Sequence, residues 1–229
     1  MLSGGSILSS LIRSQVGINN SLKISALVRS KEKANILSEK SINAVIFDDN
    51  NAIEQLQNIG AGFDIVIDPA FTFQPSYREA LIAGQGRRKR AFGKEVYYIH
   101  QSGTGNIANQ PISNKFTETR TYSDKENIQA YQRFRESVET FGQRTSDLAV
   151  LGAGPKENVK TTSVMSPTIF GKGAGHFNQT TIQVPLLVRA AVKLGHPVVV
   201  GDGSGIWNLV SIEDLCSLYA ILGSRILSG

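Results

Sequence analysis

Apolar runs and polar turns alternate along the chain in the pattern of an α/β protein. Between short, β-prone apolar runs lie segments whose apolar positions recur at helical spacing. Because short connections join each run to the next, the pattern predicts a parallel sheet with helices on both faces. Right-handed crossovers would make that sheet doubly wound. The expected strands are residues 23–28, 44–47, 65–67, 95–100 and 159–165, and the main expected helices are residues 6–14, 31–38, 51–59, 76–90, 127–141, 147–153 and 184–194.

The central feature of this pattern is the stretch EVYYIHQSGTG at residues 95–105. It predicts a buried strand that ends in a turn of small residues. Ligands of an open parallel sheet bind beyond the carboxyl ends of the strands. Ser102 would therefore face a bound reactant, and Gly103 and Gly105 would let the backbone approach it closely. An ordinary strand followed by a Ser/Gly turn explains the same residues.

The last third of the chain contains more turns. Glycines at 171, 173 and 175 indicate a loop that is mobile or covers a ligand. Residues 197–200 are expected to form a strand, residues 201–205 a turn and residues 207–210 a short strand, after which Ser211 caps the final helix. Trp207 is expected to pack against that helix.

Composition excludes several classes of protein. The formal charge is +5, but residues 87–90 alone are four bases, which we expect to coat the solvated end of a helix. The chain contains neither an aromatic-rich basic stretch nor a run of about 18 apolar residues, so neither nucleic acid nor a membrane is an expected partner. A single cysteine, Cys216, fits a reducing compartment, and we expect a cytoplasmic protein. The segment before Glu32 weakly resembles a mitochondrial presequence, but its apolar spacing favours a folded helix.

No metal-ligand spacing occurs among the three histidines and Cys216. His100 follows the buried strand and is expected to be a hydrogen-bonded core residue. Asp147 is expected at the surface or at a helix cap.

Three stretches carry a resemblance to a known family. They are residues 100–105, the strand exit SPTIFG at 166–171, and GDGSGIWNLVSIEDL at 201–215. In this order they resemble the extended or atypical short-chain dehydrogenase/reductases, the NAD-dependent epimerase/dehydratase group, over nearly the whole chain. The resemblance implies an NAD(P)-binding Rossmann-like domain at residues 1–171. It also implies a partial substrate-binding subdomain at residues 172–229 that packs on the first.

The resemblance implies a set of cofactor-binding residues. Gly4 and Gly5 correspond to the end of the glycine-rich turn that binds pyrophosphate. Arg29 would lie near the adenosine ribose, where a guanidinium suits a 2′-phosphate, so NADP is favoured and NAD remains possible. A solvated loop cation is the alternative reading of Arg29.

The resemblance implies further cofactor-binding and substrate-binding positions at the other strand ends. Asp48 matches the acid that contacts adenine, although it could equally be a turn former. Pro69 and Ala70 would lie beside the cofactor, and Pro167 and Thr168 would lie near the nicotinamide. Ser102 matches the hydroxyl that binds the substrate oxygen.

The sequence departs from the family at its beginning. The family fingerprint is Gly-x-x-Gly-x-x-Gly after an apolar strand, and only its end is present here. We therefore expect a sheet that lacks its first, central strand, between those at residues 23–28 and 65–67, as in a shortened form of a longer protein. The substrate-binding part is expected to be incomplete as well.

A second departure concerns proton transfer. The family uses Tyr-x-x-x-Lys, in which the lysine lowers the pKa of the tyrosine, and this motif does not occur in the chain. Lys125 follows Tyr122 by three residues. Arg135 follows Tyr131 by four, but Tyr131 also fits the apolar face of a helix. Ser102 with Tyr122 is the preferred catalytic pair.

The expected function is that of an NAD(P)-dependent oxidoreductase or epimerase/dehydratase-like protein that acts on a small carbonyl or hydroxyl substrate. Its expected partners are the nucleotide cofactor and that substrate. Two alternatives remain open: a non-catalytic NADP(H)-binding sensor or scaffold, and an inactive shortened form. The sequence identifies neither the substrate nor the oligomeric state.

Overall fold

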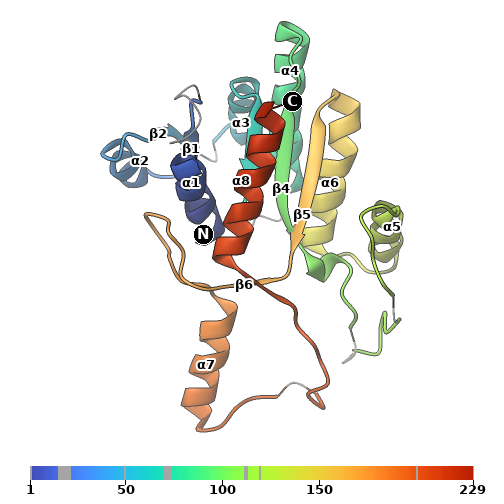
Figure 1. Cartoon of the computed structure of the whole chain (residues 1–229). Helices are drawn as coiled ribbons and strands as arrows, with labels where there is room; N and C mark the ends of the chain where they lie inside the picture. The colour runs from blue at the N-terminus through green and yellow to red at the C-terminus, as the bar shows by residue number, and fades with distance from the viewer. Residues whose placement is uncertain are drawn as a thin grey trace.

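The computed structural model describes residues 2–14, 22–48, 50–69, 74–110, 113–118, 120–199 and 201–228. Strands and helices alternate along most of the chain, as the apolar pattern predicts (Figure 1). In chain order the elements are α1 (Leu2–Ser14), β1 (Ser25–Val28), α2 (Lys31–Ser38), β2 (Asn43–Ile46), α3 (Ala52–Ala61), β3 (Ile65–Asp68), α4 (Pro75–Phe92), β4 (Tyr97–Gly103), the short 3-10 helix η2 (Thr104–Asn106), α5 (Ile128–Val138), α6 (Gly142–Glu157), β5 (Lys160–Ser166), β6 (Thr168–Phe170), α7 (Gln183–Leu194), β7 (Leu209–Ser211) and α8 (Ile212–Ser228).

All strand pairs among these elements are parallel, which confirms the predicted α/β fold class. β4 pairs with β3 on one side and with β5 on the other. The register sets Asp68 opposite His100, and Ser102 opposite Met165. The carboxyl ends of β3, β4 and β5 therefore lie along one edge of this sheet.

The sheet is divided into separate pieces. β1 pairs only with β2, and β6 pairs with β7, and neither pair is hydrogen-bonded to the sheet of β3, β4 and β5. Within the described residues no strand lies between β1 and β3.

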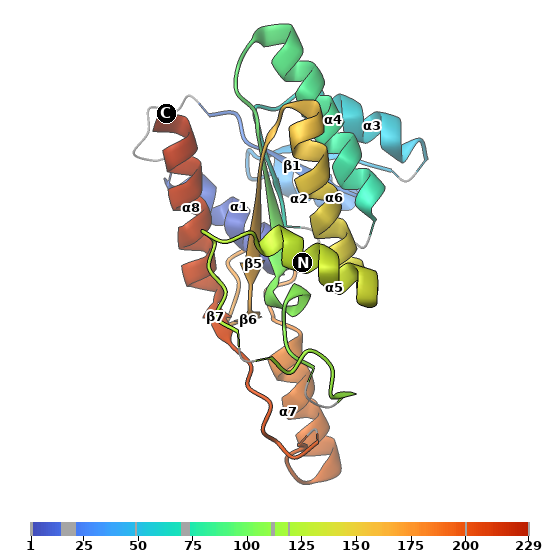
Figure 2. The ribbon, with the colours of Figure 1, turned by 90° about the vertical axis from the view of Figure 1, so that its right-hand side faces the viewer.

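Helices cover both faces of the three-stranded sheet. Figure 2 shows α4 and α6 on one side of β5 and α1 and α8 on the other. Side chains alternate from the residue before β4 onward, so Val96 and Tyr98 belong to the core under α3, α4 and α6. Ile99 belongs to the opposite core, with Leu2 of α1 and Tyr219 of α8.

Helices α3 and α4 contact each other through their backbones. A Cβ atom on Gly60 would lie 2.2 Å from the carbonyl oxygen of Leu81, and one on Gly84 would lie 2.1 Å from that of Gln57. Gly60 of α3 and Gly84 of α4 therefore allow this close packing.

The basic run at residues 87–90 lies in the carboxyl-terminal half of α4, as expected. Its charges are paired with side chains of neighbouring elements. Arg88 contacts Asp64 at 2.6 Å, Lys89 contacts Glu95 at 3.0 Å and Arg90 contacts Glu157 at 3.3 Å. These ion pairs therefore help to hold α4 against its neighbours.

Several local predictions were wrong. Helix α1 begins at Leu2, so Gly4 and Gly5 lie inside the helix and not in a turn before it. Helix α6 extends through Pro155, because a proline in the last turn costs only one main-chain hydrogen bond before Asn158 ends the helix in a left-handed conformation. Residues 197–199 form no strand. Trp207 is 66% exposed and does not pack against α8 as a core residue.

We expect Gly84→Ala to lower the free energy of unfolding by about 2–3 kcal/mol, because the added methyl group forces two backbones apart. Gly152→Ala is the matched control. That glycine is also in a helix interior, but a Cβ there meets nothing within 4 Å, so a gain of about 0.5–1 kcal/mol is expected. Urea unfolding measures both. Equal effects of the two substitutions would contradict the backbone contact.

Candidate active site

A buried polar network surrounds Ser102 at the carboxyl end of β4. The Nδ2 atom of Asn106 donates hydrogen bonds to the Oγ atom of Ser102 at 2.9 Å and to the Oδ2 atom of Asp147 at 3.2 Å. Ser102 is 3% exposed. Because its oxygen accepts a bond from Asn106, its own proton is available to a further acceptor.

Asp147 connects this network to the rest of the fold. Its carboxylate also accepts bonds from Gln132 of α5, at 2.6 Å, and from Ser163 of β5. The prediction of a surface or capping carboxylate was wrong, because Asp147 is fully buried. A buried carboxylate needs several hydrogen bonds to offset its lost hydration, and here uncharged side chains supply them.

The first turn of α6 lies against the small-residue turn that follows Ser102. The side-chain amide of Gln143 is 2.7 Å from where a Cβ on Gly103 would lie, and the ring of Phe141 is 3.8 Å from the same position on Gly105. Sequence reasoning missed both residues. The only signal was the glycines themselves, which indicate a close neighbour without identifying it.

Phe141 is the residue just before α6, and Thr145 lies near the start of this helix. A phenyl ring carries no exchangeable proton. The hydroxyl of Thr145 is engaged with Glu136 of α5. The residues that lie against Gly103 and Gly105 therefore supply neither a phenol nor an ammonium group.

The two candidate tyrosines pack together nearby. The rings of Tyr122 and Tyr131 are 5.5 Å apart, and the guanidinium of Arg120 lies 4.7 Å from the Tyr131 ring. The hydroxyl of Tyr122 donates to the carbonyl of Ile107 at 3.2 Å. Burial, together with the Tyr131 hydroxyl, raises the pKa of Tyr122 to about 12. Among the described residues, no hydrogen bond joins Tyr122 to Ser102.

Tyr131 and Arg135 have structural contacts. Tyr131 is buried at 8% exposure, as its place on an apolar helix face predicts. The guanidinium of Arg135 stacks 3.6 Å from the ring of Phe116 and donates to the carbonyl of Ala108 at 3.1 Å. These contacts fix the loop between η2 and α5 against α5.

A second polar cluster lies at the end of β3. Asp68 accepts a hydrogen bond from the Tyr98 hydroxyl at 2.9 Å, and the Nε atom of Arg78 lies 3.0 Å from the same carboxylate. Arg78 also donates to the Nδ1 atom of His100 at 3.4 Å. Burial, and then the charge of Asp68, raise the pKa of Tyr98 well above its usual value. His100 is thus the hydrogen-bonded core residue that was predicted.

The predicted cofactor residues mostly follow strand ends. Arg29 and Asp48 are exposed, just beyond β1 and β2, and Pro69 directly follows β3. Pro167 joins β5 to β6. Thr168 begins β6, where its amide donates to the carbonyl of Asn208 at 3.2 Å. Ala70 lies outside the described residues.

Gly4 and Gly5 are covered by other parts of the chain. A Cβ on Gly4 would lie 3.1 Å from Pro69, and one on Gly5 would lie 3.1 Å from Gly175. The glycine-rich loop also bonds directly to α1, since the amide of Ala174 donates to Ser6 at 3.1 Å. The loop continues to α2, where Lys33 lies 5.7 Å from the ring of Phe177. It therefore lies across the helix that carries the two glycines.

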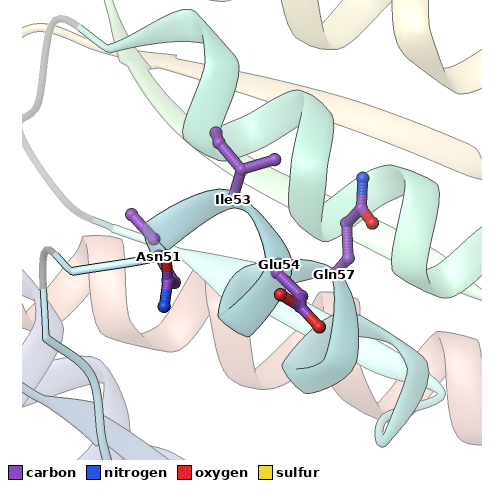
Figure 3. Close-up of a pocket in the computed structure, with 5 residues that line it drawn as sticks. Asn51, Ile53, Glu54 and Gln57 are labelled. Atoms are coloured by element: carbon purple, nitrogen blue, oxygen red, sulfur yellow. The ribbon is translucent and has the colours of Figure 1, made fainter.

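A separate hollow of about 330 Å³ lies at the beginning of α3 (Figure 3). Its lining comes from one short segment, between Asn51 and Gln57, and includes the carboxylate of Glu54. A carboxylate disfavours phosphate, so this hollow adds nothing to the candidate site around Ser102. Among the described residues no group of three or more acids, histidines and cysteines could bind a metal ion. No described helix is long and apolar enough to cross a membrane.

Comparison by sequence gives one curated relative. The chain is 30% identical over 207 residues to the oxidase ucsJ of Acremonium sp, an alignment that includes 87% of this chain and 58% of that protein. The chain therefore spans less than two thirds of the relative's length. No family model matches the sequence.

Comparison by structure gives several dehydrogenase-like folds. The yeast methylglyoxal/isovaleraldehyde reductase Gre2 in complex with NADPH has a TM-score of 0.56 and 12% identity, over 95% of this chain and 71% of that one. The Citrobacter sp. triphenylmethane reductase in complex with NADP(H) has a TM-score of 0.54 and 17% identity, over 95% and 62%. The UDP-glucuronic acid 4-epimerase of Bacillus cereus, in complex with UDP-glucuronic acid and NAD, has a TM-score of 0.54 and 12% identity, over 93% and 68%. The resemblance seen in the sequence is thus confirmed for the fold: the chain has the Rossmann-type α/β fold of the short-chain dehydrogenase/reductases.

Proposed function

We propose that the chain binds NADP(H) at the carboxyl ends of its parallel strands and is related in function to NAD(P)-dependent oxidoreductases and epimerases. The observation that carries this proposal is the hydroxyl of Ser102 at the end of β4, which accepts a hydrogen bond from Asn106 and is 3% exposed. Solved proteins of the same fold are complexed with NADPH, NADP(H) or NAD.

Each predicted cofactor residue has a proposed role. The guanidinium of Arg29 would bind the 2′-phosphate, and Asp48 would contact adenine. Pro69, Ala70, Pro167 and Thr168 would line the path from the ribose to the nicotinamide. For pyrophosphate to reach Gly4 and Gly5, Pro69 and Gly175 would have to move, because Pro69 lies against Gly4 and Gly175 lies against Gly5.

The proposed reaction uses a small carbonyl or hydroxyl substrate. The bound cofactor would supply or accept the hydride. Ser102 would donate a hydrogen bond to the substrate oxygen, with Asn106 setting the direction of that bond and Asp147 orienting the amide of Asn106. Tyr122 remains the proposed proton-transfer partner.

The second candidate function is binding of NADP(H) without catalysis, as in a sensor or scaffold. Two observations favour it. The helix that faces the Ser102 turn presents Phe141 and Gln143 in place of a phenol. The pKa of Tyr122 is raised to about 12, whereas a tyrosine that exchanges protons near neutral pH needs a lowered pKa.

Arg29→Ser tests the nucleotide site. Loss of a charge-assisted bond to the 2′-phosphate should raise the Kd for NADPH by about 10- to 100-fold and leave that for NADH nearly unchanged. Lys40→Ser, an exposed cation beyond α2, is the control and should change neither. Fluorescence titration measures both constants. Wild-type protein that unfolds cooperatively but saturates with neither nucleotide would refute the proposed function.

Turnover distinguishes the two candidate functions. For an oxidoreductase, a panel of small aldehydes and ketones should reveal oxidation of NADPH, and Ser102→Ala should reduce kcat by about 100-fold or more while NADPH still binds. For a non-catalytic binder, NADPH should bind and no panel member should be reduced. The rate of NADPH absorbance loss is the measurement.

Tyr122 should make stability depend on alkaline pH. Its pKa is raised from 10.0 to about 12 in the fold, so the folded state retains a proton that the unfolded chain loses. The resulting stabilisation is complete below pH 10 and is lost as the pH rises through about 12. In Tyr122→Phe the decline of the urea midpoint between pH 9 and 12 should be shallower. An unchanged decline would show that Tyr122 titrates normally.

A further inference from the structure

A buried guanidinium lies on α5, against the segment that follows Ser102. Arg135 is 0% exposed. Its Nη2 atom donates to the carbonyl of Ala108 at 3.1 Å, but its Nε and Nη1 atoms have no hydrogen-bond partner among the described residues. Buried side-chain donors in native proteins nearly always have an acceptor. The two nitrogens therefore point to an acceptor that this part of the chain does not supply.

The charge of Arg135 is not neutralised within the described residues. The acids that follow it are engaged elsewhere, since Glu136 contacts Arg144 at 2.9 Å and Glu139 contacts Lys115 at 3.6 Å. A cation is favourable in the last turn of a helix, where Arg135 lies. The helix dipole explains the charge at this position, but it does not explain the unpartnered nitrogens. Because an unpaired buried charge is costly, an anion at these nitrogens would stabilise the site.

An aromatic ring lies where an anion would compensate the charge. The guanidinium carbon of Arg135 is 3.6 Å from the centre of the Phe116 ring. This cation–π contact attracts the charge and gives the N–H groups no oxygen acceptor. Phe116 has a φ of 50°, a left-handed conformation that is rare for a bulky residue and that is concentrated at ligand clamps and switch regions. We define the Phe116 loop as residues 113–118. Its other residues are exposed, so the ring of a surface loop covers one side of the guanidinium.

Hydrogen bonds fix this guanidinium relative to the candidate site. The side chain of Arg144 donates to the carbonyl of Asn106 at 3.0 Å and to the carbonyl of Arg135 at 3.3 Å. Asn106 is also the residue whose amide bonds the hydroxyl of Ser102. Figure 2 shows α5 beside the start of α6, the helix that carries Arg144. A molecule that contacts both Ser102 and Arg135 would therefore need an oxygen function and an anionic group.

The surroundings of Arg135 favour a carboxylate over a phosphate group. A carboxylate is planar, carries one charge and matches the hydrogen-bonding geometry of a guanidinium. Phosphate sites commonly add the backbone amides of a helix N-terminus. Arg135 lies instead near the carboxyl end of α5, where the helix dipole opposes a second negative charge. A further cation lies nearby, since the guanidinium of Arg120 is 4.7 Å from the ring of Tyr131, one turn before Arg135.

We propose that Arg135 binds the carboxylate of a small oxo acid whose carbonyl oxygen lies at Ser102, and that the Phe116 ring moves off the guanidinium when the acid binds. This inference rests on the proposed function, because it names the class of its substrate. In the chain without substrate, the ring shields the charge. In the complex, the carboxylate accepts from the nitrogens that have no partner now.

Isothermal titration with pyruvate and benzoylformate, and with their methyl esters, tests the site with and without NADPH. The acids should bind at least about 10-fold more tightly than the esters, because only the acids carry the charge. Arg135→Met should raise the Kd for the acids by about 10- to 100-fold and leave that for the esters unchanged. Arg133→Met is the matched control. It removes an exposed arginine of the same helix and should change neither constant.

Phe116→Gly separates a binding role of Arg135 from a purely structural one. Glycine adopts the left-handed conformation without steric cost, and the ring no longer has to be displaced. The Kd for the acids should therefore fall by about 3- to 10-fold, whereas a structural stack predicts no gain.

Four results would overturn the proposal: equal binding of acids and esters, no binding of either acid up to about 10 mM, unchanged acid binding in Phe116→Gly, or tighter binding of inorganic phosphate than of the acids. An Arg135→Met variant with an unchanged circular dichroism spectrum and an unchanged preference for acids would overturn it as well. Failure of NADPH to bind refutes the proposed function instead, and the titrations without NADPH still report on Arg135.

Discussion

The buried carboxylate of Asp147 is the interaction on which the arrangement around Ser102 depends. It lies on α6 and accepts bonds from η2, α5 and β5, so four elements meet at one charge. Because those donors are uncharged, their geometry alone must offset the lost hydration of the carboxylate. A shift of α5 or α6 would break hydrogen bonds to the Asp147 carboxylate. The cost of losing those bonds keeps Asn106 and Ser102 in place.

Periodicity predicted most of the elements because burial on one face leaves a regular trace in the sequence. It could not predict single-residue surroundings. The sequence predicts that Asp147 lies at the surface, because most carboxylates do. Only the fold brings Asn106 and Gln132 to it. The sequence predicts a core position for Trp207 because large apolar residues are usually buried, whereas its exposure depends on the path of the segment between α7 and β7. The turn at Ser102 was predictable, whereas the approach of Phe141, the residue just before α6, was not.

The region around Ser102 combines features of a reactive site with features of an inert one. A hydroxyl whose oxygen is fixed by the Asn106 amide is suited to binding a substrate oxygen. The adjoining Phe141 and the raised pKa of Tyr122 oppose proton exchange near neutral pH. A Rossmann-type fold is compatible with both, because fold alone does not determine function. Whether the region is catalytic or inert therefore depends on a few side chains on α6 and the preceding loop.

The division between β1–β2 and the three-stranded sheet has a consequence for dynamics. A two-stranded pair is marginal by itself, and here Leu27 and Ile46 are both more than 40% exposed. The pair is therefore a separate cooperative unit that opens at lower free energy than β4. Its amide protons would exchange with solvent long before those of Tyr98 and Ile99, and chain cleavage by a protease would begin there.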